Sequence, residues 1–494
     1  MKKIYILAAA LLSLLAACNK DDSTGATRPI TAVTVSGLKD TFNVFTHKDF
    51  LKVTPVVQNE ANFDYYWTLF SANFIPGQGL VKADTLARTR DLNYQVLQDP
   101  GPYLLVFNVR DKQTNVTKQF SMTVNITTLT MNGWYLVKDN GGKTDMDFFY
   151  STGRIDNWIA NFNNGKSLDG NAVRAVFSPG FKSSITSPTL FNTLAVVSTN
   201  DAAIYRIDNG AMVMNFDNMF FTKPATRNPQ AIFQPIATNN LGFINDGKAY
   251  NLIKGTLFST LPVNYNNLVY SNLSPITASV AMDLGWNQTT RSIFCYSGTY
   301  YSELSAVNGG NKLKNMNANL QWMSGYTGNR SIAMLLFRNP QDTGYLFKLD
   351  AHYGQLIGSG TMILATDTLK PQHSLMSASV IAGNYDIDLL YYAVGDKIYM
   401  TDMASLQENL QFSLPAGETV TCMQHIKYPQ PLTTAPATVN YIAIATYKAG
   451  HYKVYLHAIS GTGTISFLPQ ANFEGDGRVS TVIYMEQGNG SRLF

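Results

Sequence analysis

A hairpin pattern that recurs about every 50 residues is the feature that most constrains the fold of this 494-residue chain. Each copy is an apolar strand, a turn rich in Gly, Asn or Asp, and a second strand with an aromatic residue near its start. The copies cover Trp134–Tyr150, Leu194–Asp208, Leu241–Leu252, Ser292–Leu304, Ala333–Asp350, Leu389–Met403 and Tyr441–Ile459. The aromatic residues that follow the turns are Tyr205, Tyr250, Tyr300, Phe347, Tyr399 and Tyr455. Such a period, with two or more strands per repeat, is typical of propeller blades.

Residues 128–494 are therefore predicted to form a β-propeller-like domain of about seven blades. Closure into a ring also explains how so long a β chain avoids exposed sheet edges. Stacked β-sandwiches are the alternative, because such turns and aromatic residues recur in many all-β chains. Blade motifs of known propellers do not recur, and the double glycines at 141–142 and 309–310 lack kelch spacing.

Composition supports an all-β extracellular protein. Charged residues make up only 14% of the chain, which contains 27 Tyr and 27 Phe. Aromatic residues suit the half-buried surface of a sheet. The formal net charge of +4 comes from 37 basic and 33 acidic residues. This balance argues against a nucleic-acid partner, because such proteins usually have a strongly basic face.

The first residues have the pattern of an export signal. Lys2 and Lys3 precede an apolar stretch from Ile4 to Leu15, and small residues lead to Cys18. The stretch is shorter than the ~20 apolar residues that span a bilayer. Leu15-Ala16-Ala17-Cys18 resembles the lipobox of bacterial lipoproteins. The resemblance implies a signal peptide over residues 1–17 and lipidation of Cys18; an ordinary signal peptide with a chance cysteine is the alternative.

Residues 18–28 are polar, lack periodicity and are predicted to form a flexible tether. Asn19-Lys20-Asp21-Asp22 resembles the signal that sends lipoproteins of Bacteroidota to the outer face of the outer membrane. The resemblance implies cell-surface exposure through an N-terminal lipid, with the periplasmic face as the alternative.

Residues 29–127 contain short alternating strands separated by turns and are predicted to form a β-sandwich. Three features resemble the PKD-like immunoglobulin-type domain of Bacteroidota lipoproteins: Trp67, the corner Pro100-Gly101-Pro102-Tyr103, and Asp111. The resemblance implies a tryptophan between two sheets, a corner into a late strand, and an aspartate that begins the last turn. The usual Phe-Gly-Asp-Gly is replaced by Phe70-Ser71-Ala72-Asn73, so the likeness is to the looser PKD-like group. It implies a spacer or interaction module.

The sequence predicts no metal, cofactor or catalytic residue. The six histidines form no paired zinc motif. In a strand, Cys422 and His425 lie on opposite faces, and His451 and His457 are expected to be exposed. Cys295 is expected to be a small buried apolar residue, like Cys422; a disulfide between the two is the alternative.

Two groups of residues keep other chemistry open. Two carboxylates within about 10 Å are the requirement for a glycosidase, although acids at strand ends usually serve as turn or cap residues. The candidates are Asp145, Asp147, Asp283, Asp350, Asp386, Asp388 and Glu474.

Trp158 and Trp322 are candidates for stacking platforms for sugars, with core packing as the alternative.

The absence of catalytic motifs favours a non-catalytic binding or accessory protein on the cell surface. Similar lipoproteins accompany SusCD-type uptake systems, so the resemblance implies a glycan or peptide ligand and a transporter partner. One alternative is a propeller hydrolase or lyase that uses the central funnel. The other is an adhesion or envelope-assembly component. Residues that line the centre of the ring distinguish binding from catalysis.

Overall fold

The computed structural model describes residues 32–72, 82–234, 241–253, 255–259, 264–265, 268–279, 283–297, 300–326, 331–358, 360–429 and 436–490. The chain divides into two compact units, Met1–Thr128 and Leu129–Phe494. The predicted signal peptide, Cys18 and the predicted tether lie outside the described residues. Within the described ranges, no helix has the length and apolar character needed to cross a membrane.

The first unit contains a five-stranded sheet in the order β2-β9-β8-β5-β6. Two strand pairs, β1-β4 and β3-β7, complete it. These strands are β1 (Val35–Ser36), β2 (Thr41–Phe45), β3 (Phe50–Val53), β4 (Val56–Val57), β5 (Phe63–Ser71), β6 (Asp84–Ala87), β7 (Leu92–Gln95), β8 (Gly101–Asp111) and β9 (Thr117–Thr127), with a 3-10 turn η1 (Glu60–Asn62). Side chains of β3, β4 and β7 share one buried cluster with those of β5, β8 and β9. The predicted sandwich is therefore confirmed.

The residues of the PKD-like resemblance have the roles that it implied. Trp67 is fully buried in the cluster between the sheets, 4.5 Å from the ring of Phe107. Its indole Nε1 donates a hydrogen bond to the Arg90 carbonyl over 3.1 Å. The Tyr103 hydroxyl donates to the Asp99 carbonyl at the corner into β8. Asp111 accepts two backbone N–H groups in the turn after β8.

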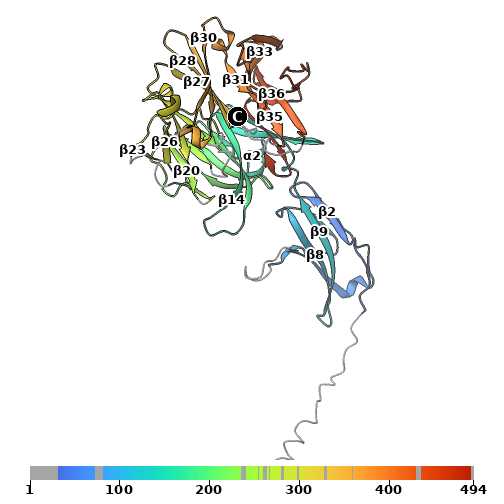
Figure 1. The fold of residues 1–494 in the computed structure, drawn as a ribbon. Helices are drawn as coiled ribbons and strands as arrows, with labels where there is room; N and C mark the ends of the chain where they lie inside the picture. The colour runs from blue at the N-terminus through green and yellow to red at the C-terminus, as the bar shows by residue number, and fades with distance from the viewer. Residues whose placement is uncertain are drawn as a thin grey trace, which may run out of the picture. The chain divides into compact units, whose positions relative to one another are not determined.

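The described part of the second unit contains seven sheets, numbered here as blades 1 to 7 (Figure 1). Blade 1 combines β10 (Gly133–Asn140), β11 (Lys143–Tyr150), β12 (Gly153–Ile155) and β13 (Leu168–Asp169) with β39 (Arg478–Glu486) and β40 (Asn489–Gly490). Blade 2 is β14 (Ala172–Phe181), β15 (Phe191–Ser198), β16 (Ala202–Arg206) and β17 (Met212–Asn215). Blade 3 is β18 (Pro229–Phe233), β19 (Gly242–Asn245), β20 (Lys248–Ile253) and β21 (Leu257–Phe258).

The other four sheets follow in chain order, with one exception in blade 4. Blade 4 is β24 (Asp283–Asn287), β25 (Ser292–Ser297), β26 (Tyr300–Glu303) and the earlier hairpin β22 (Asn264–Tyr265) and β23 (Leu268–Val269). Blade 5 is β27 (Asn319–Tyr326), β28 (Ile332–Arg338), β29 (Gly344–Asp350) and β30 (Ile363–Leu369). Blade 6 is β31 (Val380–Gly383), β32 (Leu389–Val394), β33 (Lys397–Asp402) and β34 (Glu408–Ser413). Blade 7 is β35 (Thr419–Tyr428), β36 (Val439–Lys448), β37 (His451–Ala458) and β38 (Phe473–Asp476).

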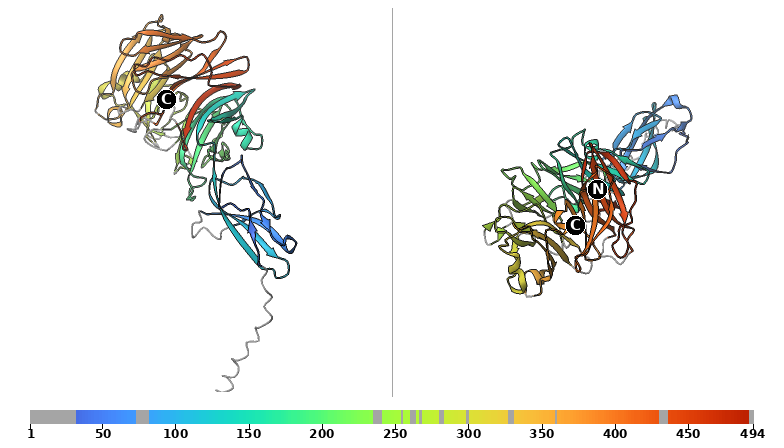
Figure 2. Two further views of the ribbon diagram at one scale, coloured as in Figure 1. Left: turned by 90° about the vertical axis from the view of Figure 1, so that its right-hand side faces the viewer. Right: turned by 90° about the horizontal axis from the view of Figure 1, so that it is seen from above.

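The ring closes through the C-terminal strand. β39 pairs antiparallel with β10, so that Tyr135 lies opposite Ile483, and β39 becomes the first strand of blade 1. First strands of neighbouring blades contact one another, including β14 with β39 and β35 with β31 and β39. These strands therefore form the inside of the ring, and β30 and β33 lie at its periphery (Figures 1 and 2). The result is a seven-bladed β-propeller, as predicted.

Buried clusters fill the spaces between consecutive blades. In the described ranges, one cluster lies at each of the seven blade junctions. Each predicted hairpin is the central strand pair of a blade, from β10–β11 to β36–β37. The aromatic residues after the turns pack toward the preceding blade: Tyr205, Tyr250, Phe347, Tyr399 and Tyr455. The sequence period therefore reflects a repeated contact between blades.

Candidate functional site

The predicted acidic candidates are engaged in local contacts, including Asp145 and Asp147, which lie two residues apart on β11 and both accept backbone N–H groups at the start of the segment from Asn157. Asp386 pairs with Lys427 (2.6 Å), Asp388 pairs with Lys348, and Asp350 contacts the ring of His352 (2.5 Å). Glu474 is exposed at the periphery of blade 7. Asp145 accepts the backbone N–H groups of Met146, Ile159 and Ala160.

The inner strands offer little for glycoside hydrolysis. Their described acidic residues are Asp283 at the start of β24 and Glu486 at the end of β39. The inner strands run in the same direction around the ring, so these carboxyl groups lie at opposite ends of it. Burial raises the pKa of Asp283 well above its usual range. The described inner strands thus place no two carboxylates together for acid–base catalysis.

Histidine placement requires one correction. His451 is exposed as expected, but His457 is fully buried, and burial lowers its pKa to about 4. The expectation failed because His457 lies within β37, where its ring stacks 5.8 Å from that of Tyr455 and accepts the Leu468 N–H. His425 is also buried and contacts Tyr385 of blade 6.

Both described cysteines are buried free thiols, in agreement with the favoured expectation. Cys295 lies in the junction of blades 4 and 5 and Cys422 in that of blades 7 and 1. Cys422 and His425 belong to opposite faces of β35. In the described residues, no group of three His, Cys, Asp or Glu side chains is arranged to hold a metal ion.

The two tryptophans proposed as platforms differ. Trp158 opens helix α2 (Trp158–Phe162) and is fully buried between blades 1 and 2, because Asp145 holds the N-terminus of this helix against the sheet. Trp158 is therefore a core residue and not a stacking platform, which was the alternative interpretation of the sequence. Trp322 is half-buried at the junction of blades 5 and 6. It lines a hollow of about 140 Å³ together with Arg338 and Met376.

A larger set of aromatic side chains meets where blades 7 and 1 close the ring. All six are half-buried, and we call them the seam surface: Trp134, Phe149, Tyr428, Tyr441, Phe473 and Tyr484. Trp134 lies directly opposite Phe149 on β11 and Tyr484 on β39, so these three rings form a ladder across blade 1. The other three rings come from β35, β36 and β38 of blade 7.

Five of the six rings form a continuous row, and the sixth, Tyr441, lies beside it with its centroid 6.4 Å from that of Trp134. Centroids are 5.6 Å apart for Tyr428 and Tyr484 and 4.9 Å apart for Tyr484 and Trp134. The row continues from Trp134 to Phe473 at 5.9 Å and from Phe473 to Phe149 at 4.6 Å. Neighbouring planes are inclined by 34° to 66°. The seam surface is therefore a curved aromatic strip rather than a flat platform.

Strand direction explains why these residues meet at one end of the ring. Trp134, Tyr441 and Phe473 lie near the starts of β10, β36 and β38. Phe149, Tyr428 and Tyr484 lie near the ends of the antiparallel strands β11, β35 and β39. Starts and ends of antiparallel neighbours share an edge, so the six positions converge.

Polar groups border both ends of the strip. The Tyr484 hydroxyl donates to Glu486 Oε2 over 3.0 Å. Burial, and then this carboxylate, raise the pKa of Tyr484 to about 12. At the other end, the Arg154 guanidinium lies 5.4 Å from the Phe149 ring centre and donates to the Glu474 carbonyl. Aromatic faces with hydroxyl, carboxylate and guanidinium groups at their edges suit a ligand that is apolar on its faces and polar at its rim.

Sequence reasoning missed the seam surface. Tyr441 and Trp134 were noted only as hairpin boundaries, and the six residues are spread from position 134 to position 484. The available signal was aromatic residues at the ends of the first and last predicted hairpins, which a closed ring brings together.

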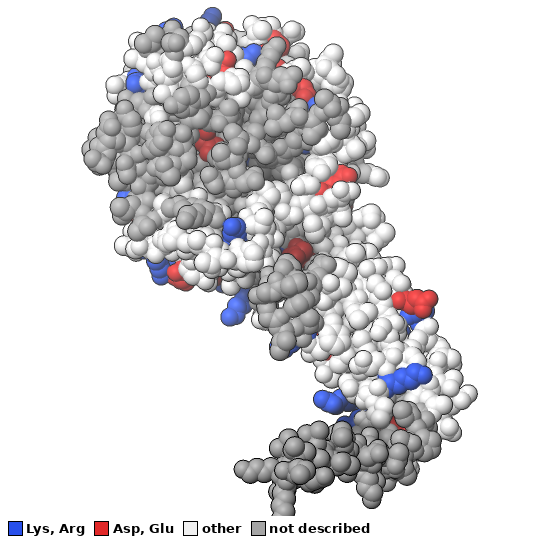
Figure 3. Space-filling model, turned by 60° about the horizontal axis from the view of Figure 1, so that its bottom comes forward, with Lys and Arg blue, Asp and Glu red and all other residues white. Residues whose placement is uncertain are grey.

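The charged surface has no concentrated basic patch in the view of Figure 3, where Lys, Arg, Asp and Glu are few and dispersed among uncharged residues. Fold and site together define a two-module β protein: a PKD-like sandwich, and a seven-bladed propeller with an aromatic strip at its closing seam.

Residues 21–172 match the PKD-like family. This span includes the sandwich and continues into blade 1, so the match supports the resemblance for the N-terminal part of the chain. No curated protein sequence matches the chain.

Solved structures with a similar fold are distant in sequence. A quinonprotein alcohol dehydrogenase-like protein from Bacteroides thetaiotaomicron has 12% identity and a TM-score of 0.44, over 92% of this chain and 98% of that one. Apo AztD from Citrobacter koseri has 8% identity and a TM-score of 0.40, over 87% and 99%. The β-propeller domain of Cps50 (Swd1) from Myceliophteria thermophila has 10% identity and a TM-score of 0.35, over 65% and 97%. Such distant similarity indicates nothing about activity.

Proposed function

We propose that this chain is a lipid-anchored, non-catalytic binding protein of the cell surface, and that the seam surface binds a neutral glycan. The observation that carries the proposal is the continuous row of five half-buried aromatic rings at the junction of blades 7 and 1, with the sixth ring, Tyr441, beside Trp134. Partly exposed tryptophan and tyrosine provide a large contact area at low entropic cost, since each has only two side-chain torsions.

A sugar suits this strip better than an extended peptide does. A pyranose presents C–H groups on its faces and hydroxyls around its edge. The strip presents ring faces with the Glu486 carboxylate, the Tyr484 hydroxyl and Arg154 at its ends. A peptide bound in an extended form usually pairs with a free strand edge, but β10, β11 and β39, which carry Trp134, Phe149 and Tyr484, are each paired with strands on both sides.

The anchor and transporter belong to the same proposal. The resemblance of Leu15-Ala16-Ala17-Cys18 to a lipobox supports membrane attachment. The polar residues 18–28 would hold the sandwich and the propeller away from the membrane. A glycan-binding protein in this position serves a SusCD-type uptake system by raising the local concentration of its nutrient.

The test compares two tryptophans in the mature chain. Affinity gel electrophoresis with laminarin, xylan, mannan, starch and dextran measures glycan binding, and a tryptic digest of casein is the peptide probe. Trp134→Ala should weaken binding more than tenfold, since loss of a central aromatic anchor costs about 2 kcal/mol or more. Trp322→Ala removes a half-buried tryptophan elsewhere on the ring and should leave binding unchanged.

Thermal unfolding of both variants checks that each remains folded. The proposal fails if the wild type binds none of the five glycans, if it binds only casein peptides, or if Trp322→Ala abolishes binding while Trp134→Ala does not.

A further inference from the structure

A cavity of about 410 Å³ opens on blade 7, where β36 turns into β37. This volume is within the range of pockets that hold small molecules in proteins. None of the residues that line the cavity belongs to the seam surface, so it is separate from the proposed glycan site. The lining includes Glu418, Thr446, Lys448, His451, Lys453 and Glu474.

Strand register places most of these side chains on one face of the sheet. Lys453 of β37 lies directly opposite Thr446 of β36 and opposite Glu474 of β38. His451 of β37 lies opposite Lys448 of β36. Residues that lie opposite each other point to the same face, and so do residues two apart on a strand. The cavity therefore lies over one face of the sheet and receives side chains from three neighbouring strands.

One acid–base pair in the cavity is complete. The side chain of Glu418, which precedes β35, is 3% exposed, and Lys453 Nζ donates to its Oε1 over 3.1 Å. The Thr446 and Tyr455 hydroxyls donate to its Oε2 over 2.7 Å and 3.0 Å. Burial acts to raise the pKa of Glu418, but these hydrogen bonds outweigh it and lower the pKa below its usual range. Glu418 and Lys453 thus neutralise each other.

Two opposite charges in the cavity have no counter-charge. Across the described residues, the exposed Glu474 carboxylate takes part in no ion pair or hydrogen bond. Lys453 lies directly opposite Glu474 in the ladder, but its ammonium group is bound to Glu418. The Lys448 ammonium donates to the Ala416 carbonyl over 2.8 Å and meets no carboxylate in the same described ranges. Glu474 and Lys448 are therefore both available to a ligand.

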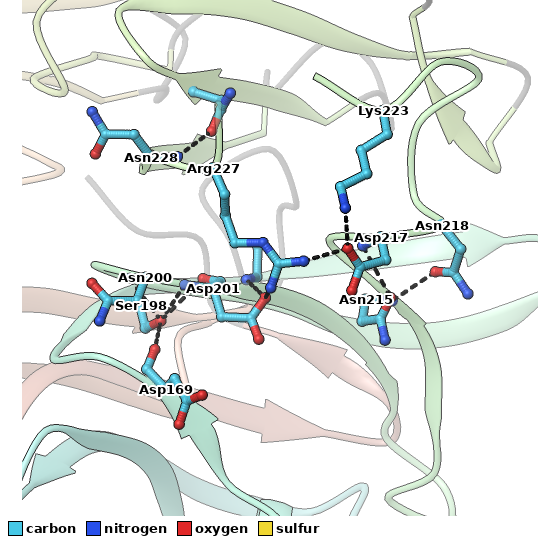
Figure 4. Close-up of polar contacts among 12 residues, drawn as sticks. Asp169, Ser198, Asn200, Asp201, Asn215, Asp217, Asn218, Lys223, Arg227 and Asn228 are labelled. Atoms are coloured by element: carbon cyan, nitrogen blue, oxygen red, sulfur yellow. Dashed lines mark hydrogen bonds and ion pairs between the residues drawn. The ribbon is translucent and has the colours of Figure 1, made fainter. Parts of the chain in front are cut away.

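An acidic group between blades 2 and 3 shows the contrast. Asp217, which follows β17, pairs with Lys223 (2.6 Å) and with Arg227, as Figure 4 shows. Hydrogen bonds from Arg227 and Lys223 lower the pKa of Asp217 to about 2. An acidic side chain that stabilises the fold is balanced in this way, whereas Glu474 is not.

We propose that the cavity binds a short peptide with free termini, with its ammonium group on the Glu474 carboxylate and its carboxylate on the Lys448 ammonium. β37 lies between β36 and β38, so the backbones of these two strands are about 10 Å apart. Three residues in an extended conformation also span about 10 Å, so a tripeptide reaches from one charge to the other. A metal ion fits less well, because one free carboxylate does not supply the several oxygen ligands that Ca²⁺ requires.

The experiment titrates the mature protein at pH 7 and constant ionic strength with triglycine, N-acetyltriglycine, triglycine amide and glycine. Thermal unfolding is the readout, because a ligand of the folded state raises the melting temperature with saturation. Triglycine should raise it. Each blocked peptide lacks one terminal charge and should need at least about tenfold higher concentration, since it loses a charge-assisted hydrogen bond. Glycine should also act more weakly than triglycine, because its two charges are too close together to reach both side chains.

Variants of the two unpaired charges locate the site. Glu474→Gln and Lys448→Met should each abolish the saturable response to triglycine. Asp396→Asn and Lys397→Met are matched controls at exposed charges of blade 6 and should retain it. Trp134→Ala should also retain it, since the cavity does not depend on glycan binding at the seam surface.

Stability without peptide distinguishes a ligand site from a structural role. Glu474→Gln removes no ion pair or hydrogen bond among the described residues, so its melting temperature should equal that of the wild type, whereas a structural role predicts a lower one. The proposal is overturned by a wild type that does not respond to triglycine, by an equal response to glycine or to either blocked peptide, by an unchanged response in Glu474→Gln or Lys448→Met, by a lower melting temperature of Glu474→Gln without peptide, or by loss of the response in Trp134→Ala.

Discussion

The Tyr452 hydroxyl donates a 2.6 Å hydrogen bond to Asp147 Oδ2, although the two residues are 305 positions apart. Lys138 donates to the same oxygen over 2.8 Å. The side chains of Lys138 and Asp147 are 6% and 1% exposed, so this is a buried ion pair capped by a phenol. Tyr452 lies on β37 of blade 7 and Asp147 on β11 of blade 1. The closing seam thus contains a polar cluster in addition to the β10–β39 ladder.

Loss of the Tyr452 hydroxyl should weaken the seam. Tyr452→Phe leaves a buried carboxylate with one donor fewer and should lower the free energy of unfolding by about 1–3 kcal/mol. Lys138→Met leaves Asp147 without its counter-ion and should cost about 3–5 kcal/mol. Urea unfolding measures both. Tyr447→Phe, at a hydroxyl without a hydrogen-bond partner among the described residues, should change stability by less than ~0.5 kcal/mol; equal effects of the two Tyr→Phe variants would contradict the assignment.

Gly477 should tolerate no side chain. It connects β38 to β39 at φ +100°, and an added Cβ would lie 2.5 Å from the Asp139 carbonyl oxygen. Gly450 has a similar φ of +92° but open space around it. Gly450→Ala should cost about 1 kcal/mol from backbone strain alone. Gly477→Ala adds a clash with the backbone of β10 and should cost clearly more in the same urea experiment. A smaller loss for Gly477→Ala than for Gly450→Ala would show that β39 shifts freely at the seam.

The central hairpins could be predicted because their signal is local. An apolar strand, a tight turn and an aromatic residue lie within about 20 residues of one another, and the same inter-blade contact repeats at Tyr205, Tyr250 and Phe347. Turns such as Asp246-Gly247, at φ 52° and 66°, carry their own sequence signature. The fourth strand of blade 4 has no such signal, since β22 precedes β24 in the chain and pairs parallel with β26.

The candidate site could not be predicted because it depends on ring closure. The Trp134–Tyr484 pair exists only after β39 joins β10. No local sequence pattern predicts that two strands more than 300 residues apart will pair. The sequence left the burial of Trp158 open, and its prediction that His457 is exposed was wrong, for a related reason. Each depends on what the fold places beside it: Asp145 at the start of α2, and the rings of Tyr455 and Phe412 around His457.

His425 should make stability depend on pH. Its Nδ1 accepts the Tyr385 N–H over 2.9 Å, so Nε2 carries the proton and donates to Asn440 Oδ1 over 2.7 Å. Burial lowers the pKa of His425 from 6.5 to about 4, with Asp386 and Lys427 as the nearby charges. Between these values the unfolded chain binds a proton that the folded chain does not. Stability is therefore lost as the pH falls from 6.5 toward 4.

The comparison of pH 7 with pH 5 isolates this contribution. The wild type should lose about 2 kcal/mol more than His425→Gln over this interval, because one pKa unit corresponds to about 1.4 kcal/mol. His451→Gln, at an exposed histidine, should retain the wild-type dependence. If His425→Gln retains it as well, the imidazole does not titrate as proposed.

Cys18 should decide where the protein resides. If it carries acyl chains, each buried methylene contributes about 0.8 kcal/mol to membrane attachment, so several chains hold the protein firmly. Cys18→Ala should move the full-length protein from the detergent phase to the aqueous phase in a Triton X-114 partition. Cys295→Ala, which removes a buried thiol, should leave the protein in the detergent phase.

Replacing Lys20, Asp21 and Asp22 by alanine should retain membrane attachment but protect the protein from protease added to intact cells, because these residues form the proposed surface signal. Detergent-phase partition of Cys18→Ala would exclude the lipid anchor, and unchanged protease sensitivity of the triple variant would exclude the surface signal while leaving the anchor intact.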